Sequence, residues 1–389
     1  MRDLRGAKIA LGLASVCLGV LLGEILLSWV DPQVSRRSRV WQFDPDLGWE
    51  HIASSTGWMV GPEYEVEIRI NADGLRDRSH SREKEAGTRR VLVFGDSFVE
   101  GWGVRLEDSV SKLLEENLQQ RSASSSVEVI NFGVAGFGTD QEMLLFEKLG
   151  SQYRPDQVLV FFYANDLANN SSRMGIGAER GYKPQFRLGR NGQLFLTGVP
   201  VKKVPFWDED AWRAQPWKRR LGKYLYEHWH LYVLLHKVLA PAEVKAEQRQ
   251  MFYESLYGKG YDPRIGQAWE LTGRLLQSFK EKVVGANAQL LLVYVPAIVQ
   301  VEEENWTMKR DLYGLIGEFD LRKPNRELAR LAARYDIPML DLNEEFARQA
   351  RRQILYFRES HWNPQGHALA ARLVADYLDG REQTEQSGE

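Results

Sequence analysis

The sequence predicts an α/β domain in three layers, with a central parallel sheet of about five strands. Five apolar runs are suited to buried parallel strands: Arg90–Gly95, Val127–Phe132, Gln157–Tyr163, Gln289–Val295 and Ile337–Leu342. Amphipathic stretches alternate with them: Glu107–Gln120, Gln141–Leu149, Gln267–Val284, Arg326–Tyr335 and Gln365–Leu378. The last stretch begins at Asn363-Pro364, an N-cap residue followed by proline at the first helical position. Functional residues of such a sheet collect at the C-terminal ends of its strands.

Residues 1–30 are expected to form a transmembrane helix that is kept as a signal anchor. The apolar run Ile9–Val30 follows a short basic segment and is interrupted only by Glu24. About 20 helical residues cross a hydrocarbon core of about 30 Å, so this run is long enough. A cleaved signal peptide and a buried helix of a soluble protein are the alternatives. The basic N-terminus favours a single pass with the large domain exported, and the only cysteine, Cys17, lies within the span.

The rest of the chain divides into a linker, a main domain and a tail. Residues 31–88 are predicted to be a linker with a small β element, because Tyr64–Ile70 alternates polar and apolar residues and Asn71–Gly74 is a turn sequence. Residues 89–380 form the main domain and 381–389 a polar tail. The predicted third and fourth strands are separated by an insertion at about 170–265.

The insertion is rich in aromatic and basic residues. Its aromatic residues include Trp207, Trp212, Trp217, Tyr224, Tyr226, Trp229 and Tyr232. One interpretation is a helical subdomain that packs on the sheet. The other is a lid or substrate platform, since aromatic faces stack well on sugar rings.

Composition and charge exclude several classes of function. Of the residues, 43% are hydrophobic and 27% are charged, as in an ordinary globular protein. A net charge of −2 gives no indication of nucleic-acid binding. The spacing of His228, His230 and His236 fits no common metal-ligand pattern, and no nucleotide fingerprint is present. We therefore expect no metal and no cofactor.

Four segments carry residues suited to acyl transfer, and each follows a predicted strand. Ser97 lies near the end of the segment Val91–Phe98, directly after the first strand and its turn, and a glycine-rich stretch, Asn131–Gly138, follows the second strand. Asn165 follows the third strand, and the segment Glu359–His367 follows the fifth. A serine, backbone N–H donors, an amide and a histidine are the nucleophile, oxyanion donors and base that acyl transfer requires.

These segments resemble blocks I, II, III and V of the SGNH (GDSL-type) hydrolases, in the same order. The resemblance covers about residues 89–378, apart from the insertion, and implies a flavodoxin-like fold. It implies that Ser97 is the nucleophile and first oxyanion donor, that Gly136 and Asn165 complete the oxyanion hole, and that His361 is the general base. The chain is also similar to membrane-anchored SGNH proteins encoded with bacterial exopolysaccharide genes. Those proteins share the N-terminal span, a stretch like Asn71–Arg76 and an ending like residues 361–364.

The sequence departs from the family at the acidic residue of the triad. The family usually has an aspartate three residues before the histidine, where this chain has Arg358. Glu359 is two residues before His361, and residues two apart in an extended segment point to the same side. Glu359 is therefore the candidate orienting acid, by analogy with a D-x-H arrangement in alginate O-acetylation proteins. The alternative is a Ser97–His361 dyad with Glu359 solvated.

Other residues near the motifs have secondary roles or compete for the same roles. Trp102, Arg358 and Trp362 are candidates for lining the substrate cleft, although both tryptophans could simply pack. His367 is a rival base on the last predicted helix. Asp96 and Asp166 are expected to be turn and capping residues.

The resemblance implies a serine esterase that removes acyl groups, in particular O-acetyl groups, from an extracellular polysaccharide. A polysaccharide O-acetyltransferase that uses the same site is the first alternative. A non-catalytic polysaccharide-binding scaffold is the second. The expected partners are an acylated carbohydrate or other small ester, the inner (cytoplasmic) membrane through the N-terminal helix, and exopolysaccharide assembly proteins.

Overall fold

The computed structural model describes residues 2–122, 126–171, 183–203, 213–239, 243–260 and 262–387. Trp207 and Trp212, which belong to the aromatic insertion, lie outside the described residues.

A five-stranded parallel sheet forms the centre of the main domain. Its strands are β6 (Thr88–Gly95), β7 (Ser126–Gly133), β8 (Gln157–Tyr163), β11 (Gln289–Val295) and β12 (Met339–Asp341). They are arranged in the order β12-β11-β8-β6-β7, and all neighbouring pairs are parallel. This is the strand order of flavodoxin-like folds, in which ligands bind where the order reverses, between the first and third strands. The predicted fold class is confirmed, and β8 and β11 have the predicted bounds.

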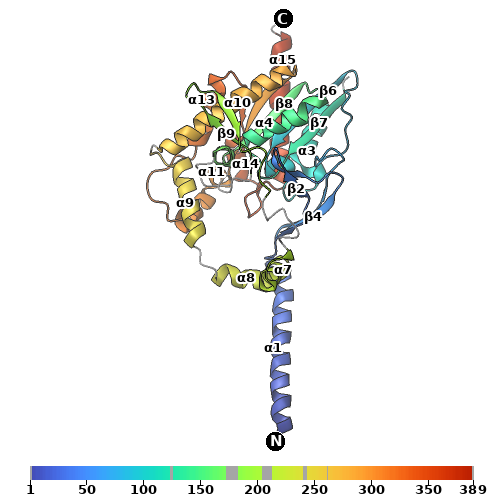
Figure 1. Ribbon diagram of the computed structural model, residues 1–389, viewed down its shortest axis with the longest axis vertical. Helices are drawn as coiled ribbons and strands as arrows, with labels where there is room; N and C mark the ends of the chain where they lie inside the picture. Colours follow the sequence, from blue (N-terminus) through green and yellow to red (C-terminus); the bar gives the residue numbers. More distant parts are fainter. Residues whose placement is uncertain are drawn as a thin grey trace.

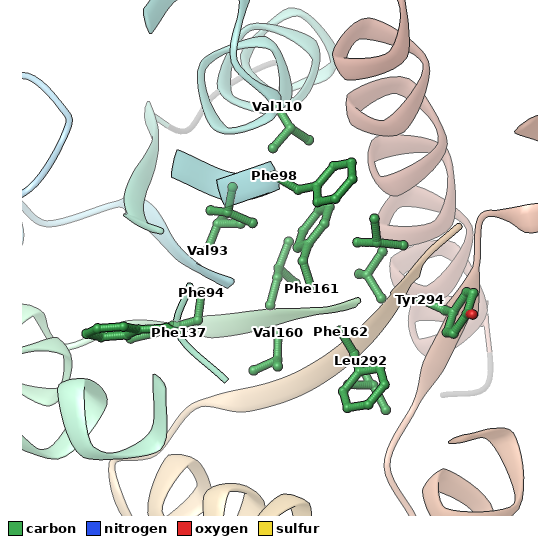
Figure 2. Packing of buried hydrophobic residues seen from close by; sticks show 14 of the residues in the cluster. Val93, Phe94, Phe98, Val110, Phe137, Val160, Phe161, Phe162, Leu292 and Tyr294 are labelled. Carbon is green, nitrogen blue, oxygen red and sulfur yellow. The ribbon is translucent and has the colours of Figure 1, made fainter. Parts of the chain in front are cut away.

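Helices cover both faces of this sheet (Figure 1). On one face α3 (Val110–Arg121) packs on β7 and on α15 (Pro364–Ser387). On the other face α10 (Pro263–Gly285) packs on α4 (Thr139–Lys148) and α13 (Lys323–Arg334). Because successive side chains of a strand point to opposite faces of the sheet, each strand packs against both helical layers. Figure 2 shows Phe161 pointing toward Phe98 and Val110, while Val160 and Phe162 point to the opposite side.

Short elements connect these layers. They are α2 (Ser97–Glu100), the 3-10 helices η1 (Leu106–Asp108) and η2 (Gly150–Tyr153), α5 (Asn165–Asn170), α11 (Ile298–Val301), α12 (Glu303–Leu312) and α14 (Asn343–Ala350).

The segment before the main domain folds as two small antiparallel sheets. One contains β1 (Arg36–Arg37), β4 (Thr56–Gly61) and β5 (Tyr64–Arg69), and the other is the hairpin of β2 (Trp41–Asp44) and β3 (Gly48–His51). The predicted strand at Tyr64 and the turn after it are confirmed. In the turn, the Asn71 side chain accepts the N–H groups of Asp73 and Leu75, at 2.9 Å each.

The N-terminal helix α1 (Arg2–Val30) projects from the domain (Figure 1). Its segment Ala7–Val30 is long and apolar enough to cross a membrane, and it is not buried against the rest of the chain. Glu24 is the exception to its apolar character. The Glu24 carboxylate accepts the backbone N–H groups of His230 and Leu231, at 2.7 and 2.8 Å. The end of α1 is therefore joined to the insertion.

The described residues of the insertion form a hairpin and three helices. These are β9 (Gln185–Leu188), β10 (Leu194–Thr197), α7 (Trp217–His228), α8 (His230–Leu239) and α9 (Glu243–Tyr257). The interpretation that the aromatic insertion packs on the sheet is wrong for α7 and α8. They lie beside the end of α1, away from the sheet (Figure 1), because α8 packs on α1 and α7 and its first N–H groups are held by Glu24.

Candidate active site

Ser97 is the first residue of α2, immediately after β6. Asp96 precedes this helix, and its carboxylate accepts the Phe98 N–H at 2.9 Å, which confirms the capping role expected of Asp96. The helix ends after one turn because Gly101 adopts a φ of 87°. Ser97 is thus held at the C-terminal end of β6, beside β8, and it is largely buried.

His361 lies 2.8 Å from Ser97, measured from Nε2 to Oγ, although 264 residues separate them in the chain. His361 is placed by a tight turn whose ends, Tyr356 and Trp362, form an antiparallel bridge. Within the turn the Phe357 N–H donates to the His361 carbonyl at 2.8 Å, and Ser360 has a φ of 85°. The segment is therefore a turn, whereas the prediction for Glu359 assumed an extended segment.

The turn nevertheless brings Glu359 to the imidazole. Glu359 Oε2 lies 2.5 Å from His361 Nδ1, so serine, histidine and glutamate form one hydrogen-bonded chain. Arg358, at the usual position of the aspartate, points elsewhere. Its side chain is 79% exposed and its guanidinium lies 3.6 Å from Asp31, while its backbone N–H donates to Glu63 at 2.6 Å.

Two aromatic side chains pack against the imidazole ring of His361. Trp102 stacks on His361 with a centroid distance of 5.4 Å and an interplanar angle of 20°, and Phe98 lies 5.2 Å away. The Trp102 indole N–H donates to the Tyr64 hydroxyl at 2.8 Å. Burial and the neighbouring Glu359 carboxylate raise the pKa of Tyr64, so this hydroxyl stays protonated.

Of the three candidates for lining the cleft, Trp362 is incorrect. Its side chain is fully buried and packs on Phe98, Phe346 and His367. A residue in the middle of an aromatic cluster has no surface to offer a substrate. Trp102 is partly buried and lies against the His361 imidazole, and Arg358 is exposed two residues before Ser360.

The predicted oxyanion donors lie at the same edge of the sheet as Ser97. Gly136 adopts a φ of 81°, which favours glycine, and its carbonyl accepts the Asn169 amide at 3.3 Å. Asn165 begins α5, and its Nδ2 donates to Asp96 at 2.9 Å, which leaves the second N–H of that amide for a substrate oxygen. Within the described ranges, no protein acceptor takes the N–H of Ser97 or Gly136.

Two family comparisons match different halves of the domain. The GDSL-like lipase/acylhydrolase family matches residues 93–243, which include Ser97, Gly136 and Asn165. The family described as SGNH hydrolase-like domain, acetyltransferase AlgX, matches residues 254–389, which include Glu359 and His361. The chain belongs to the SGNH hydrolases.

Solved structures similar to this SGNH chain are distant in sequence. An acetyl xylan esterase shares 17% identity over 74% of this chain and 99% of its own, with a TM-score of 0.40. A lipase/acylhydrolase from Enterococcus faecalis shares 12% identity over 75% and 96%, with a TM-score of 0.38. A two-domain esterase active on acetylated mannans shares 14% over 76% and 50%, with a TM-score of 0.37. A comparison with curated protein sequences gave no significant match.

The second SGNH segment holds α2 in place through close packing. A Cβ added to Gly133 would lie 2.2 Å from the backbone nitrogen of Glu100. The Asn131 side chain joins the same two elements, since it donates to the Val99 carbonyl at 2.9 Å and accepts the Gly133 N–H at 2.8 Å. The group that approaches the Gly133 backbone closely is the helix that carries Ser97.

Gly133→Ala is therefore expected to lower kcat on the order of 10- to 100-fold, because misplacing a catalytic group by about 1 Å can cost on the order of 100-fold. Overpacking should also lower the free energy of unfolding by about 1–3 kcal/mol. Ester hydrolysis and thermal unfolding measure the two effects. Gly285→Ala is the matched control, because no atom lies within 4 Å of the added Cβ. Equal kcat values for the two variants would contradict this role of Gly133.

A buried charge network supports the Gly136 loop and was missed by sequence reasoning. The Ala135 N–H donates to the carboxylate of Glu100, which is fully buried. His51 Nε2 lies 3.5 Å from this carboxylate, and the buried Arg76 guanidinium donates to the Glu100 carbonyl at 2.8 Å. Burial raises the pKa of Glu100, but His51 and Arg76 outweigh it and the net shift is downward. In the sequence, the family resemblance of the stretch Asn71–Arg76 was the feature that could have indicated a role for Arg76.

His367 is not placed to act as the base. It is buried under α3, and its Nδ1 accepts the Val110 N–H at 3.1 Å. Burial, together with the positive charges of Arg76 and His361, lowers the pKa of His367 to about 3. His367 is therefore neutral in the folded protein, and its hydrogen bond with Val110 has a structural role.

The low pKa of His367 predicts acid sensitivity of the fold. The unfolded chain takes up this proton below pH of about 6.5, whereas the folded chain does so only near pH 3. Between these values stability rises with pH, by up to about 1.4 kcal/mol per pH unit from this group. Denaturant unfolding of the parent and of His367→Asn at pH 7, 6 and 5 measures this pH dependence of the free energy of unfolding. We expect a shallower pH slope in the variant, and equal slopes would refute the assignment.

Proposed function

We propose that this chain is a serine esterase that hydrolyses O-acyl esters, in particular O-acetyl esters of a polysaccharide. The observation that carries the proposal is the chain of contacts from Ser97 Oγ through His361 to Glu359, at 2.8 and 2.5 Å. Membership of the SGNH hydrolases supports ester chemistry. The match to an acetyltransferase family of the SGNH type supports acetyl as the acyl group.

In the proposed mechanism His361 Nε2 takes the proton of Ser97 Oγ as that oxygen attacks the ester carbonyl. Glu359, at Nδ1, keeps the ring in the tautomer that accepts at Nε2 and stabilises the imidazolium that forms. The N–H groups of Ser97 and Gly136 and the Asn165 amide hold the oxyanion. The imidazolium then gives its proton to the departing sugar oxygen. Water, deprotonated by His361, attacks the acyl-serine and releases the carboxylic acid and the free serine.

A polysaccharide O-acetyltransferase is the second candidate, and the match of residues 254–389 to the AlgX acetyltransferase domain favours it. Both reactions share the acyl-serine. They differ only in whether water or a sugar hydroxyl attacks it.

One experiment separates the candidates. The full chain, purified in detergent, is incubated with p-nitrophenyl acetate, with and without an oligosaccharide acceptor. Acetate released without acceptor supports the esterase, and acetylated oligosaccharide supports the transferase. If neither product forms while the oligosaccharide binds, the protein is a polysaccharide-binding scaffold and both enzymatic proposals fail.

We also propose that α1 is a retained signal anchor in the cytoplasmic membrane, with residues 89–380 exported as the catalytic domain and exopolysaccharide assembly proteins as neighbours. Retention is supported by the contacts that α1 and the residues just after it make with the folded chain. Besides the Glu24 contacts, the Gln33 N–H donates to His230 Nδ1 at 2.7 Å, and Lys237 donates to the Gln33 side chain at 2.8 Å. Cleavage after α1 would remove the carboxylate that caps α8.

This topology predicts that the protein stays in the membrane fraction after an alkaline carbonate wash. Protease added to spheroplasts should digest the large domain, because it lies outside the cytoplasmic membrane. Immunoblotting with an antibody against the domain measures both. Complete protection from protease until the membrane is permeabilised would show that the orientation is reversed, and release by carbonate would show that α1 is no anchor.

A further inference from the structure

The helices α7 and α8 expose an apolar surface at the end of the presumed span. In α7, Trp217, Leu221 and Tyr224 are 63%, 45% and 54% exposed, and no described residue of this helix is buried. At 100° per residue these three side chains and His228 fall on one face of the helix. In α8, Val238 and Leu239 are 72% and 76% exposed. Exposed apolar side chains that gather on neighbouring helices indicate a surface that binds a partner.

The charge of α7 indicates which partner this is. The helix has four basic residues, Lys218, Arg219, Arg220 and Lys223, and one acidic residue, Glu227. The chain as a whole has a net charge of −2, so the basic character is local. An apolar stripe bordered by lysine and arginine, with tryptophan and tyrosine in the stripe, is typical of helices that lie in the interface of an anionic bilayer.

The position of α8 on α1 places both helices at the level of that interface. Glu24, which holds the first N–H groups of α8, lies six residues before the end of the span at Val30. At 1.5 Å per residue this is about 9 Å along the helix, close to where acyl chains give way to headgroups. Figure 1 shows α8 lying across the end of α1, with α7 beside it. The two backbone N–H groups also give the Glu24 carboxylate the hydrogen bonds that a charged group needs at this depth.

The catalytic edge of the sheet faces the same side. The Arg358 guanidinium, one residue before Glu359, lies 3.6 Å from Asp31, the first residue after α1. A recess of about 520 Å³ is lined by the chain after α1, by the β4–β5 hairpin with Tyr64, and by His228 and His230 at the junction of α7 and α8. From Pro364, just after His361, α15 runs away from α1 to the C-terminus (Figure 1).

We propose that α7 and α8 form an interfacial surface that lies on an anionic phospholipid bilayer and holds the catalytic edge toward the membrane. This rests on the proposed anchor and goes beyond the proposed reaction. It implies that the ester substrate is presented at the bilayer surface. The apolar face enters the boundary between acyl chains and headgroups, and the flanking basic side chains contact lipid phosphates.

The test places a fluorophore on each face of α7 in the full chain. Cys17 is the only cysteine, so Cys17→Ala allows Leu221→Cys, Arg219→Cys or Val284→Cys to be labelled with NBD. Leu221 lies on the apolar face and Arg219 on the polar face of the same helix. Val284 is 55% exposed near the end of α10, just before β11 begins, and so lies at the edge of the sheet opposite the catalytic edge. The labelled chains are reconstituted in vesicles of 70% phosphatidylcholine and 30% phosphatidylglycerol that contain spin-labelled phosphatidylcholine.

We expect severalfold stronger quenching by the spin-labelled lipid at Leu221 than at Arg219, and almost none at Val284. Vesicles of phosphatidylcholine alone should reduce quenching at Leu221. Equal and weak quenching at all three positions would overturn the proposal, as would a Leu221 label that is shielded from aqueous iodide but not quenched by lipid, because a protein would then cover the face. Flotation of the vesicles tests the anchor separately, and acetate release tests the reaction separately.

Discussion

Ser97→Ala is expected to abolish ester turnover while leaving the fold intact. The Ser97 hydroxyl is the group that lies 2.8 Å from His361 Nε2, and its loss removes the nucleophile. A loss of roughly 10⁶-fold in kcat is the scale seen when a triad serine is removed. Folding should persist because the cap of α2 is made by the Asp96 side chain and not by Ser97. Labelling by a serine-reactive fluorophosphonate and hydrolysis of p-nitrophenyl acetate measure the result.

Ser360→Ala is the control for the labelling experiment. Ser360 lies in the turn beside His361, but its backbone φ of 85° is equally strained with either side chain, so the substitution changes only the hydroxyl. This variant should label like the parent. Labelling that persists in Ser97→Ala would show that another serine is the nucleophile.

Glu359→Gln is expected to lower kcat at least about 100-fold. The carboxylate lies 2.5 Å from His361 Nδ1, and an amide at that point can hold the wrong tautomer and cannot stabilise the imidazolium. Loss of the acid in a serine triad costs on the order of 10⁴-fold, which sets the upper scale. Trp102 and Phe98 pack on the imidazole and help to hold its position. The substitution should therefore change the protonation state and charge of the imidazole more than its position. Steady-state kinetics with p-nitrophenyl acetate measures the effect.

Arg358→Ala is the control for this experiment. The Arg358 guanidinium points to Asp31, at 3.6 Å, and only its backbone N–H, which the variant keeps, contacts Glu63. We expect a kcat close to that of the parent, and any effect of the substitution should be confined to KM. Activity of Glu359→Gln within a few-fold of the parent would mean that Ser97 and His361 work as a dyad.

The sequence by itself determined the fold class and the residues that meet at the site. Alternation of apolar runs with amphipathic stretches is a local property, so it predicted the strands of the sheet and the helices of its two layers. Parallel strands carry their C-terminal ends to one edge, so Ser97, Gly136, Asn165 and His361 could be placed together from their positions after strands. The small sheets of residues 36–61 were missed because short edge strands lack a clear alternation.

Only the tertiary structure decided how Glu359 reaches His361, what lies behind the oxyanion loop and where the insertion packs. The turn around Ser360 depends on a bridge between Tyr356 and Trp362, and burial of Trp362 removes it from the cleft. Contacts such as Glu100 with His51 or Glu24 with His230 join residues far apart in the chain. Periodicity and motif spacing describe neighbours along the chain, whereas these pairings depend on which buried charges and free N–H groups the packed fold brings together.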